Sequence, residues 1–120
     1  RLIYVVNDQY GIPTSTKFIV FYLNKILKKI IMKEKLSNIY HLTPNGKTSW
    51  YNFSILILNS LNKNRKKVID KNIILPCYSN FYDRAIRPVN SVLNSGNIQK
   101  KIKKKFKNWE YYFYKEFKKK

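Results

Sequence analysis

The sequence predicts an α+β fold that is mainly helical and incomplete as an independent fold. Three observations carry this prediction. A short β-branched apolar run lies at residues 2–6, apolar residues recur at helical spacing in three later segments, and the formal net charge is +19 over 120 residues. A compact monomer with that charge would repel itself. The expected order is a short N-terminal strand, an amphipathic helix, a central helix, a small hairpin or extended arm, and a long basic C-terminal helix.

Three segments follow one another in this prediction. Residues 1–35 form a strand-loop-helix unit, residues 36–97 a mixed helix and irregular basic segment, and residues 98–120 a basic amphipathic helix.

The first segment predicts a strand, a loop and a helix. The run LIYVV at residues 2–6 is followed by turn-forming residues at 7–11, which indicates a buried strand. From Phe18 to about Lys35 the apolar residues share one side of a helix and the lysines lie mostly on the other. The apolar side comprises Ile19, Leu23, Ile26, Leu27, Ile30 and Ile31. Three hydroxyl residues can cap this helix by accepting a hydrogen bond from a free amide: Thr14, Ser15 and Thr16.

The middle segment is less regular. Residues 41–49 are typical of a turn. The stretch from Ser49 to Leu61 has both strand character and helical spacing, and we favour the helix. Two β-branched runs within residues 67–76 predict either a small hairpin or an extended arm. Residues 78–96 show little periodicity, so we expect an irregular segment that follows a surface supplied by another molecule.

The last segment predicts one continuous helix over residues 98–120. Apolar residues recur there at spacings of four, four, three, four and four, which makes a single stripe. This stripe comprises Ile98, Ile102, Phe106, Trp109, Phe113 and Phe117. A stripe this continuous predicts docking on a protein partner.

The sequence predicts neither catalysis nor a metal site. Cys77 is the single cysteine, His41 is the single histidine, and the six acidic residues are scattered. The motif NGKTS at residues 45–49 lacks the upstream glycine of a phosphate-binding loop. The longest apolar run, residues 18–32, is interrupted by lysines well short of a bilayer span. We therefore expect no enzyme activity, no cofactor, no metal ion, no small-molecule substrate and no transmembrane insertion.

The charge predicts a polyanionic partner, with nucleic acid first and an anionic membrane surface second. Arg84 and Arg87 can each fork onto a phosphate, although a local pair between Asp83 and Arg87 is the alternative. The residues expected to contact RNA are Lys63, Arg65, Lys66, Lys67, Arg84, Arg87, Lys100, Lys101, Lys103, Lys104, Lys105 and Lys107.

The chain resembles the ribosomal proteins of a mitochondrion or another organelle, which are small and basic with irregular arms. Lys, Asn, Ile, Tyr and Phe make up more than half of it, as AT-rich codons would specify. Residues 2–30 are similar to the last strand, loop and helix of the second small-subunit ribosomal protein family. In that family an apolar strand ends in a loop with an aspartate, and an Ile-Pro pair and small polar residues precede the last helix. Here the corresponding positions are Asp8, residues 12–13 and residues 14–16. The loop after Asp8 is shorter than usual, and the family's acidic pair is absent.

The resulting hypothesis is a structural constituent of the small subunit of a mitochondrial ribosome. It would act in translation in the matrix, bind rRNA backbone and pack on neighbouring ribosomal proteins, with an organelle-encoded gene as one option. Two alternatives stay open: a basic accessory subunit of an organellar respiratory membrane complex lying on anionic lipid, and an organellar DNA-packaging protein. Salt-sensitive binding to rRNA, to vesicles or to any duplex DNA would separate the three.

Overall fold

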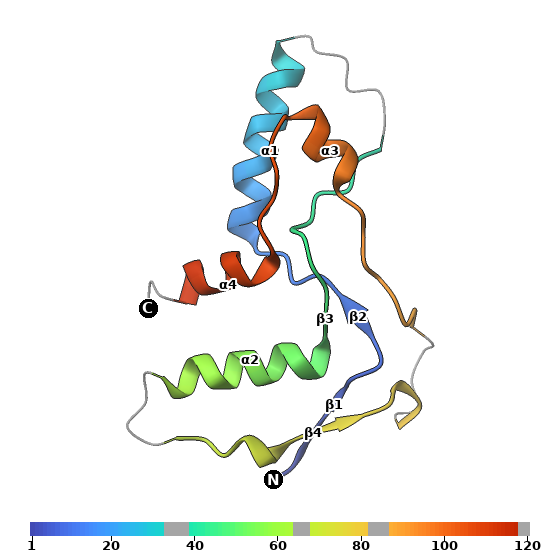
Figure 1. Ribbon diagram of the computed structural model, residues 1–120, viewed down its shortest axis with the longest axis vertical. Coiled ribbons are helices and arrows are strands. Elements are labelled where there is room, and N and C mark those ends of the chain that lie inside the picture. The colour runs from blue at the N-terminus through green and yellow to red at the C-terminus, as the bar shows by residue number, and fades with distance from the viewer. Residues whose placement is uncertain (33–38, 64–67, 82–86, 118–120) are drawn as a thin grey trace. The chain divides into compact units, whose positions relative to one another are not determined.

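A computed structural model describes residues 1–32, 39–63, 68–81 and 87–117 (Figure 1). The chain forms two compact units: unit 1 joins residues 1–11 to 47–92, and unit 2 joins residues 12–46 to 93–120. Each unit thus combines an early segment with a late one. The division into 1–35, 36–97 and 98–120 concerns consecutive segments, and it stays a prediction.

Unit 1 contains a parallel pair of strands with a helix between them in sequence. Strand β1 (Ile3–Val6) pairs with β4 (Ile74–Cys77) in parallel, so that Ile3 lies opposite Ile74 and Val6 opposite Cys77. Helix α2 (Trp50–Asn62) packs against both strands (Figure 1). A parallel pair needs such a crossover connection, which makes this a βαβ unit. The strand predicted at residues 2–6 is confirmed as Ile3–Val6, but the prediction that it is buried is wrong, because Leu2, Ile3 and Tyr4 are exposed.

The hairpin predicted within residues 67–76 is wrong. The described part of this segment holds a short 3₁₀ helix, η1 (Lys71–Ile73), followed by β4, whose hydrogen-bonding partner is the distant β1. The physical reason is the parallel register, which an adjacent run in a tight hairpin could not provide. An α/β arrangement therefore stands where the sequence predicted an α+β fold.

Helix α2 confirms the helical interpretation of the stretch from Ser49 to Leu61. It begins after Ser49, whose hydroxyl accepts a hydrogen bond from the Asn52 amide at 3.1 Å. That bond satisfies one of the free amides at the start of the helix.

A second small sheet in unit 1 brings three segments together. Strand β2 (Tyr10–Gly11) pairs antiparallel with β3 (Thr48–Ser49). Tyr10 also forms a parallel bridge with Asn90. The Tyr10 amide donates to the Val89 carbonyl at 2.8 Å, and the Tyr10 carbonyl accepts from the Ser91 amide at 2.9 Å. Residues 89–91, within the segment expected to follow another molecule, are thus held by this chain itself. A second 3₁₀ helix, η2 (Ser79–Phe81), lies earlier in the described part of that segment.

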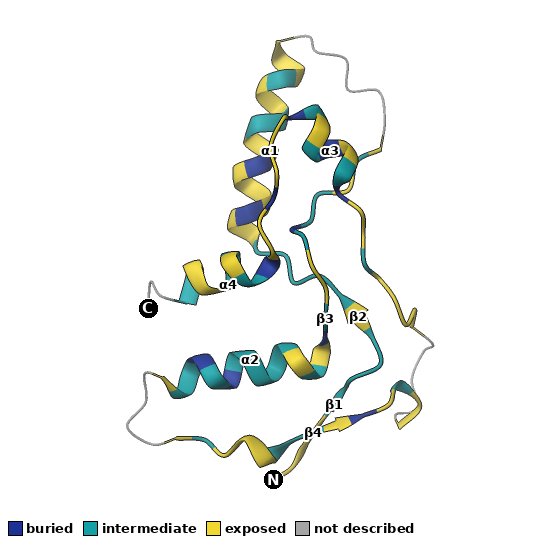
Figure 2. Cartoon of the chain, in the orientation of Figure 1, coloured by how far each residue is buried: buried dark blue, intermediate teal, exposed yellow. Residues whose placement is uncertain are grey.

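Unit 2 is built on helix α1 (Thr16–Ile31), which Ser15 caps through a 3.1 Å bond from the Phe18 amide. The helix buries Phe18 and Tyr22, whereas most of the apolar side predicted from the sequence is exposed (Figure 2). The exposed residues are Ile19, Leu23, Leu27, Ile30 and Ile31.

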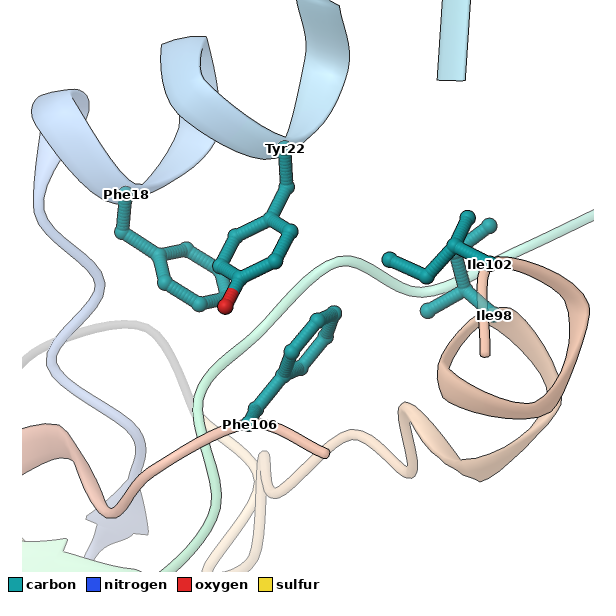
Figure 3. Packing of buried hydrophobic residues seen from close by; sticks show 5 residues of the cluster. All are labelled: Phe18, Tyr22, Ile98, Ile102 and Phe106. Carbon is teal, nitrogen blue, oxygen red and sulfur yellow. The ribbon is translucent and has the colours of Figure 1, made fainter. Parts of the chain in front are cut away.

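The core of unit 2 is largely aromatic. Phe106 lies 5.1 Å from Phe18 and 4.4 Å from Tyr22 between ring centroids, and Ile98 and Ile102 complete the cluster (Figure 3). Burial of the Tyr22 phenol raises its pKa, and its hydrogen bond with Tyr112 acts in the same direction. Large buried rings contribute much of the packing stability of a small unit.

The single C-terminal helix predicted over residues 98–120 is wrong within the part that the structure describes. Two separate helices are present, α3 (Gly96–Lys101) and α4 (Trp109–Phe117). Between them, the backbone of Lys103 has a left-handed φ of 52°. The side chain of Gln99 accepts a bond from the Phe106 amide at 2.7 Å, and Asn45 donates to the Phe106 carbonyl at 2.6 Å. These bonds satisfy backbone groups that a continuous helix would otherwise pair.

Among the described residues, no helix is both long and apolar enough to cross a bilayer.

Candidate functional site

The candidate site lies in unit 1, where the two parallel strands end. Because β1 and β4 run in the same direction, their carboxyl ends meet at one edge, and such edges are where α/β proteins commonly bind ligands. Asn7 and Asp8 follow β1, and Ser79 follows β4 closely. Together with Ser49, these three residues form what we term the carboxyl-edge cluster.

Asp8 is tied to the segment after β4 by two hydrogen bonds. Its Oδ1 accepts from the Ser79 amide at 2.9 Å, and its Oδ2 accepts from the Ser79 hydroxyl at 2.8 Å. The hydroxyl bond is the main reason that the pKa of Asp8 lies below its ordinary value, since it stabilises the charged carboxylate. Burial, assisted by the charge of Asp8, raises the pKa of the Cys77 thiol. Asp8 is therefore a fixed anion in this cluster.

Asn7 connects the end of β1 to the start of α2. The Ser49 hydroxyl donates to Asn7 Oδ1 at 2.7 Å while it accepts from the Asn52 amide. Ser49 is fully buried, so both of its hydrogen bonds are shielded from water. Asn7 thus binds the start of α2, and its neighbour Asp8 binds Ser79 after β4.

Cationic and aromatic side chains border the cluster. Lys47 Nζ lies 5.5 Å from the ring centroid of Tyr10, and Arg87, which is exposed, lies two positions before the Val89 carbonyl that Tyr10 binds. Trp50 follows Ser49 directly and is 58% exposed, and Tyr78 precedes Ser79 and is 73% exposed. Exposed cations can bind phosphate and exposed rings can stack on a planar base.

The hydrogen bonds of Asp8 give it a structural role in the cluster. Both oxygens of Asp8 already accept hydrogen bonds, so this carboxylate is placed to hold structure. Within the described ranges, no three His, Cys, Asp or Glu side chains gather as metal ligands would.

The residues predicted to bind RNA divide between the two units and the part of the chain that the structure does not describe, and their role stays a prediction. Four of them, Arg65, Lys66, Lys67 and Arg84, lie outside the described residues. Lys63 follows α2 and Arg87 lies two positions before Val89, both in unit 1. The remaining six belong to unit 2: Lys100, Lys101, Lys103, Lys104, Lys105 and Lys107.

The predicted docking stripe is divided between two helices and the bend between them. Ile98, Ile102 and Phe106 are buried in the core of unit 2, and Trp109 is buried as well. Phe113 and Phe117 are half-buried, with ring centroids 4.6 Å apart. Most of the stripe therefore packs within its own chain.

Sequence reasoning missed the carboxyl-edge cluster. A signal was present, because Asn7 and Asp8 directly follow an apolar strand and Ser79 follows another β-branched run. Pairing those two runs in parallel would have placed the three residues at one edge.

Comparison with known proteins gives a consistent result. A family model described as the RmlD substrate binding domain matches residues 1–119. The dTDP-4-dehydrorhamnose reductase of Salmonella typhimurium is 26% identical over 106 residues, which is 88% of this chain and 36% of that protein. The enzyme of the same name from Aggregatibacter actinomycetemcomitans is 32% identical over 109 residues, again 88% and 36%. The chain thus spans about a third of the length of these relatives.

Two solved structures share the fold. A dTDP-4-dehydrorhamnose reductase from Bacillus anthracis, in complex with NADP, matches with a TM-score of 0.71 at 23% identity, over 92% of this chain and 36% of that one. A dTDP-4-dehydrorhamnose reductase from Clostridium acetobutylicum matches with a TM-score of 0.67 at 29% identity, over 91% and 35%. The fold is accordingly part of a Rossmann-like arrangement with a parallel sheet, and the predicted α+β ribosomal fold is wrong.

These findings overturn the hypothesis drawn from charge and composition. The resemblance to ribosomal proteins, the role in translation and the respiratory-complex alternative are wrong, because the family model and the relatives point to sugar-nucleotide reductases. The expectation of no enzyme is contradicted by the relatives' name. The predicted rRNA partner and the absence of a small-molecule substrate are wrong for the same reason. The relatives are bacterial, which contradicts a mitochondrial location.

Proposed function

Since the chain belongs to the RmlD substrate binding domain family, we propose that it forms the substrate-binding part of a dTDP-4-dehydrorhamnose reductase. The ligand implied by that name is a thymidine diphosphate sugar, with a planar base, an anionic pyrophosphate and a keto sugar. The chain spans about a third of its relatives, so the reduction itself is proposed for an assembly that contains the rest of their fold.

The observation that carries this proposal is the border of the carboxyl-edge cluster. Lys47 and Arg87 offer positive charge for the pyrophosphate, and the exposed rings of Trp50 and Tyr78 offer surfaces for thymine. Helix α2 begins at the same edge, and the positive end of its dipole favours an anion there.

NADP does not fit the residues of this chain. The dinucleotide fingerprint needs glycines at close spacing before a helix, so that the backbone can approach the pyrophosphate. The three glycines here, Gly11, Gly46 and Gly96, are far apart in sequence, and Gly46 faces the ring of Trp109. We therefore assign the nucleotide sugar to this chain and no step of the hydride transfer.

Titration calorimetry of the 120-residue chain with thymidine diphosphate tests the proposal. We expect saturable binding that Lys47→Glu and Arg87→Glu each weaken roughly tenfold, because each change replaces attraction for phosphate with repulsion. Lys63→Glu is the matched control. It lies at the opposite end of α2, about 20 Å away along the helix, and should leave the affinity within about twofold. A folded chain that shows no saturable binding of thymidine diphosphate would contradict the proposal.

A further inference from the structure

Ser49 holds the side-chain amide of Asn7 in one orientation. The Ser49 hydroxyl accepts a hydrogen bond from the Asn52 amide at 3.1 Å and donates its single hydrogen to Asn7 Oδ1 at 2.7 Å. Ser49 is fully buried, so water cannot provide another acceptor for that hydrogen. If the Asn7 amide turned over, its NH₂ group would face the hydroxyl, and the buried hydrogen would lose its acceptor. The amide oxygen of Asn7 therefore points at Ser49, and its NH₂ group points away.

The NH₂ group of Asn7 has donors to offer. Among the described residues, no side chain or carbonyl accepts a hydrogen bond from it, because the side-chain contact of Asn7 is made through Oδ1. The backbone amide of Asn7 is already used, since it donates to the Cys77 carbonyl at 2.9 Å and extends the pairing of β1 with β4. Asn7 is half-buried. Its NH₂ group thus presents two donors and no acceptor at the carboxyl edge.

Asn7 lies between groups already proposed to contact the nucleotide. Its side chain binds Ser49, which lies two positions after the exposed Lys47. Its backbone binds Cys77, which precedes the exposed ring of Tyr78. The oxygens of a pyrophosphate only accept hydrogen bonds, whereas the edge of thymine also carries an N–H donor. A group with donors alone, close to a lysine in sequence, therefore matches the pyrophosphate better than the base.

We infer that Asn7 is a binding residue whose NH₂ group donates to the pyrophosphate of the nucleotide sugar, and that Ser49 is the positioning residue that fixes this orientation. The inference rests on the proposed function and deepens it. Asn7 contacts the ligand, and Ser49 acts on the ligand only through Asn7.

Asn7→Asp removes the donors and keeps the bond to Ser49. One carboxylate oxygen at position 7 accepts from the Ser49 hydroxyl as the amide oxygen does, but the other is an acceptor where the NH₂ group donated. We expect calorimetric titration to show that thymidine diphosphate binds roughly tenfold or more weakly, because hydrogen bonds to a charged group are lost. Unchanged affinity in the folded variant would overturn the inference.

Asn52→Asp is the matched control for the added charge. Asn52 is exposed in the first turn of α2 and bonds Ser49 through its backbone amide, which the substitution leaves in place. The variant therefore carries the same new charge near the same cluster without losing the Asn7 donors. We expect it to weaken the binding of thymidine diphosphate less than about threefold, because an exposed charge is screened. Equal weakening by the two substitutions would show repulsion by charge alone and overturn the inference.

Ser49→Ala tests the positioning role. Without the hydroxyl the Asn7 amide is free to turn over, so binding of thymidine diphosphate should weaken roughly threefold to tenfold. Ser49→Thr keeps a hydroxyl and should bind within about twofold of the unaltered chain. In a chain that already carries Asn7→Asp, Ser49→Ala should change the affinity less than about twofold, since no donor is left to orient. Additive losses from the two substitutions would overturn the positioning role.

The ¹⁵N relaxation of side-chain NH₂ groups without ligand provides an independent reading. We expect the order parameter of the Asn7 NH₂ group to be about 0.85, as in rigid backbone, and to fall below about 0.6 in Ser49→Ala. Ser54→Ala is the control, because it removes a hydroxyl of the same helix that bonds the Tyr51 carbonyl, and it should leave the value unchanged. A mobile Asn7 NH₂ group in the unaltered chain would overturn the inference, even if Ser49→Ala fails to fold.

Thymidine without phosphates separates the two parts of the ligand. In NMR titrations, Asn7→Asp should leave the affinity for thymidine within about twofold while it weakens that for thymidine diphosphate. Equal losses for both ligands would place Asn7 at the base and overturn the assignment to the pyrophosphate, while the proposed function stands. Absence of thymidine diphosphate binding by the unaltered chain overturns the proposed function, and the relaxation measurement still decides whether Ser49 orients Asn7.

Discussion

The two units hold their late segments by different means. In unit 2, Ile98, Ile102 and Phe106 pack against Phe18 and Tyr22 of α1, so apolar burial fixes the segment. In unit 1, Ser79 and residues 89–91 are tied by hydrogen bonds to Asp8 and Tyr10, while Tyr78 and Val89 beside these bonds are exposed. Burial gives stability but hides side chains, whereas hydrogen bonds can hold the backbone while a neighbouring side chain such as Tyr78 stays exposed. We therefore expect substitutions in unit 2 to act mainly on stability and those at the carboxyl edge to act mainly on binding.

The largest expected effect is on the aromatic core of unit 2. Phe106→Ala should lower the free energy of unfolding by about 3–5 kcal/mol, because it removes a buried ring and leaves a cavity. Phe21→Ala is the control, since Phe21 is 55% exposed on α1, and should cost less than about 1 kcal/mol. Urea unfolding of both variants provides the measurement. If both substitutions lowered the free energy of unfolding equally, the aromatic core would not be what stabilises unit 2.

The polar ties inside unit 2 should come next. Gln99→Ala removes the acceptor of the Phe106 amide and the donor to Asn45 and Ser95, so we expect a loss of about 1–3 kcal/mol. Asn97→Ala, an exposed change on the same helix, should cost less than about 0.5 kcal/mol. Denaturant unfolding monitored by tryptophan fluorescence distinguishes them. A Gln99→Ala chain as stable as the Asn97→Ala chain would exclude this role for the side chain.

A smaller effect is expected at the start of α2. Ser49→Ala removes the cap of the helix and the bond to Asn7, with an expected cost of about 1–2 kcal/mol. Ser54→Ala, the same change inside α2, removes only a bond to the Tyr51 carbonyl of the same helix and should be nearly neutral, because alanine favours helix. Thermal unfolding compares the two. If Ser54→Ala proved the more damaging, the cap would not be what starts α2.

Acid should weaken the hydrogen bonds between Asp8 and Ser79. Its pKa is lowered in the folded chain, mainly by the Ser79 hydroxyl, so its contribution is complete above the ordinary value of 3.8 and is lost as pH falls through the lower folded value. We expect the stability difference between the unaltered chain and Asp8→Asn to shrink between about pH 5 and pH 2. Unfolding measured across that range tests this. If the stability difference grew on acidification, the charged form of Asp8 would not be the one that stabilises the folded chain.

Local signals in the sequence predicted three elements correctly. The strand at residues 2–6, the capped helix that includes Phe18 and the helix after Ser49 each depend on neighbours within a few positions. The parallel pairing of β1 with β4 depends on residues far apart in sequence, and periodicity cannot detect it. The C-terminal spacing likewise gave no sign that Gln99 and Asn45 would satisfy the backbone of a bend.

The candidate site was not predicted from the sequence. Arg87 was singled out for its charge as an RNA contact, whereas the carboxyl-edge cluster is made of small polar residues that carry no strong sequence signal. The net charge of +19 drew attention to lysine-rich segments such as 100–107 instead. Charge alone does not separate an RNA-binding surface from a solvated one.

Chemical-shift mapping of the ¹⁵N-labelled chain with thymidine diphosphate tests whether the nucleotide binds at the carboxyl edge. We expect the largest shifts on residues 47–50, 78–79 and 87–91 of unit 1, around the ends of β1 and β4. Shifts as large on the lysines of residues 100–107 in unit 2, or confined to them, would show that the ligand follows charge and would contradict a site at the carboxyl edge.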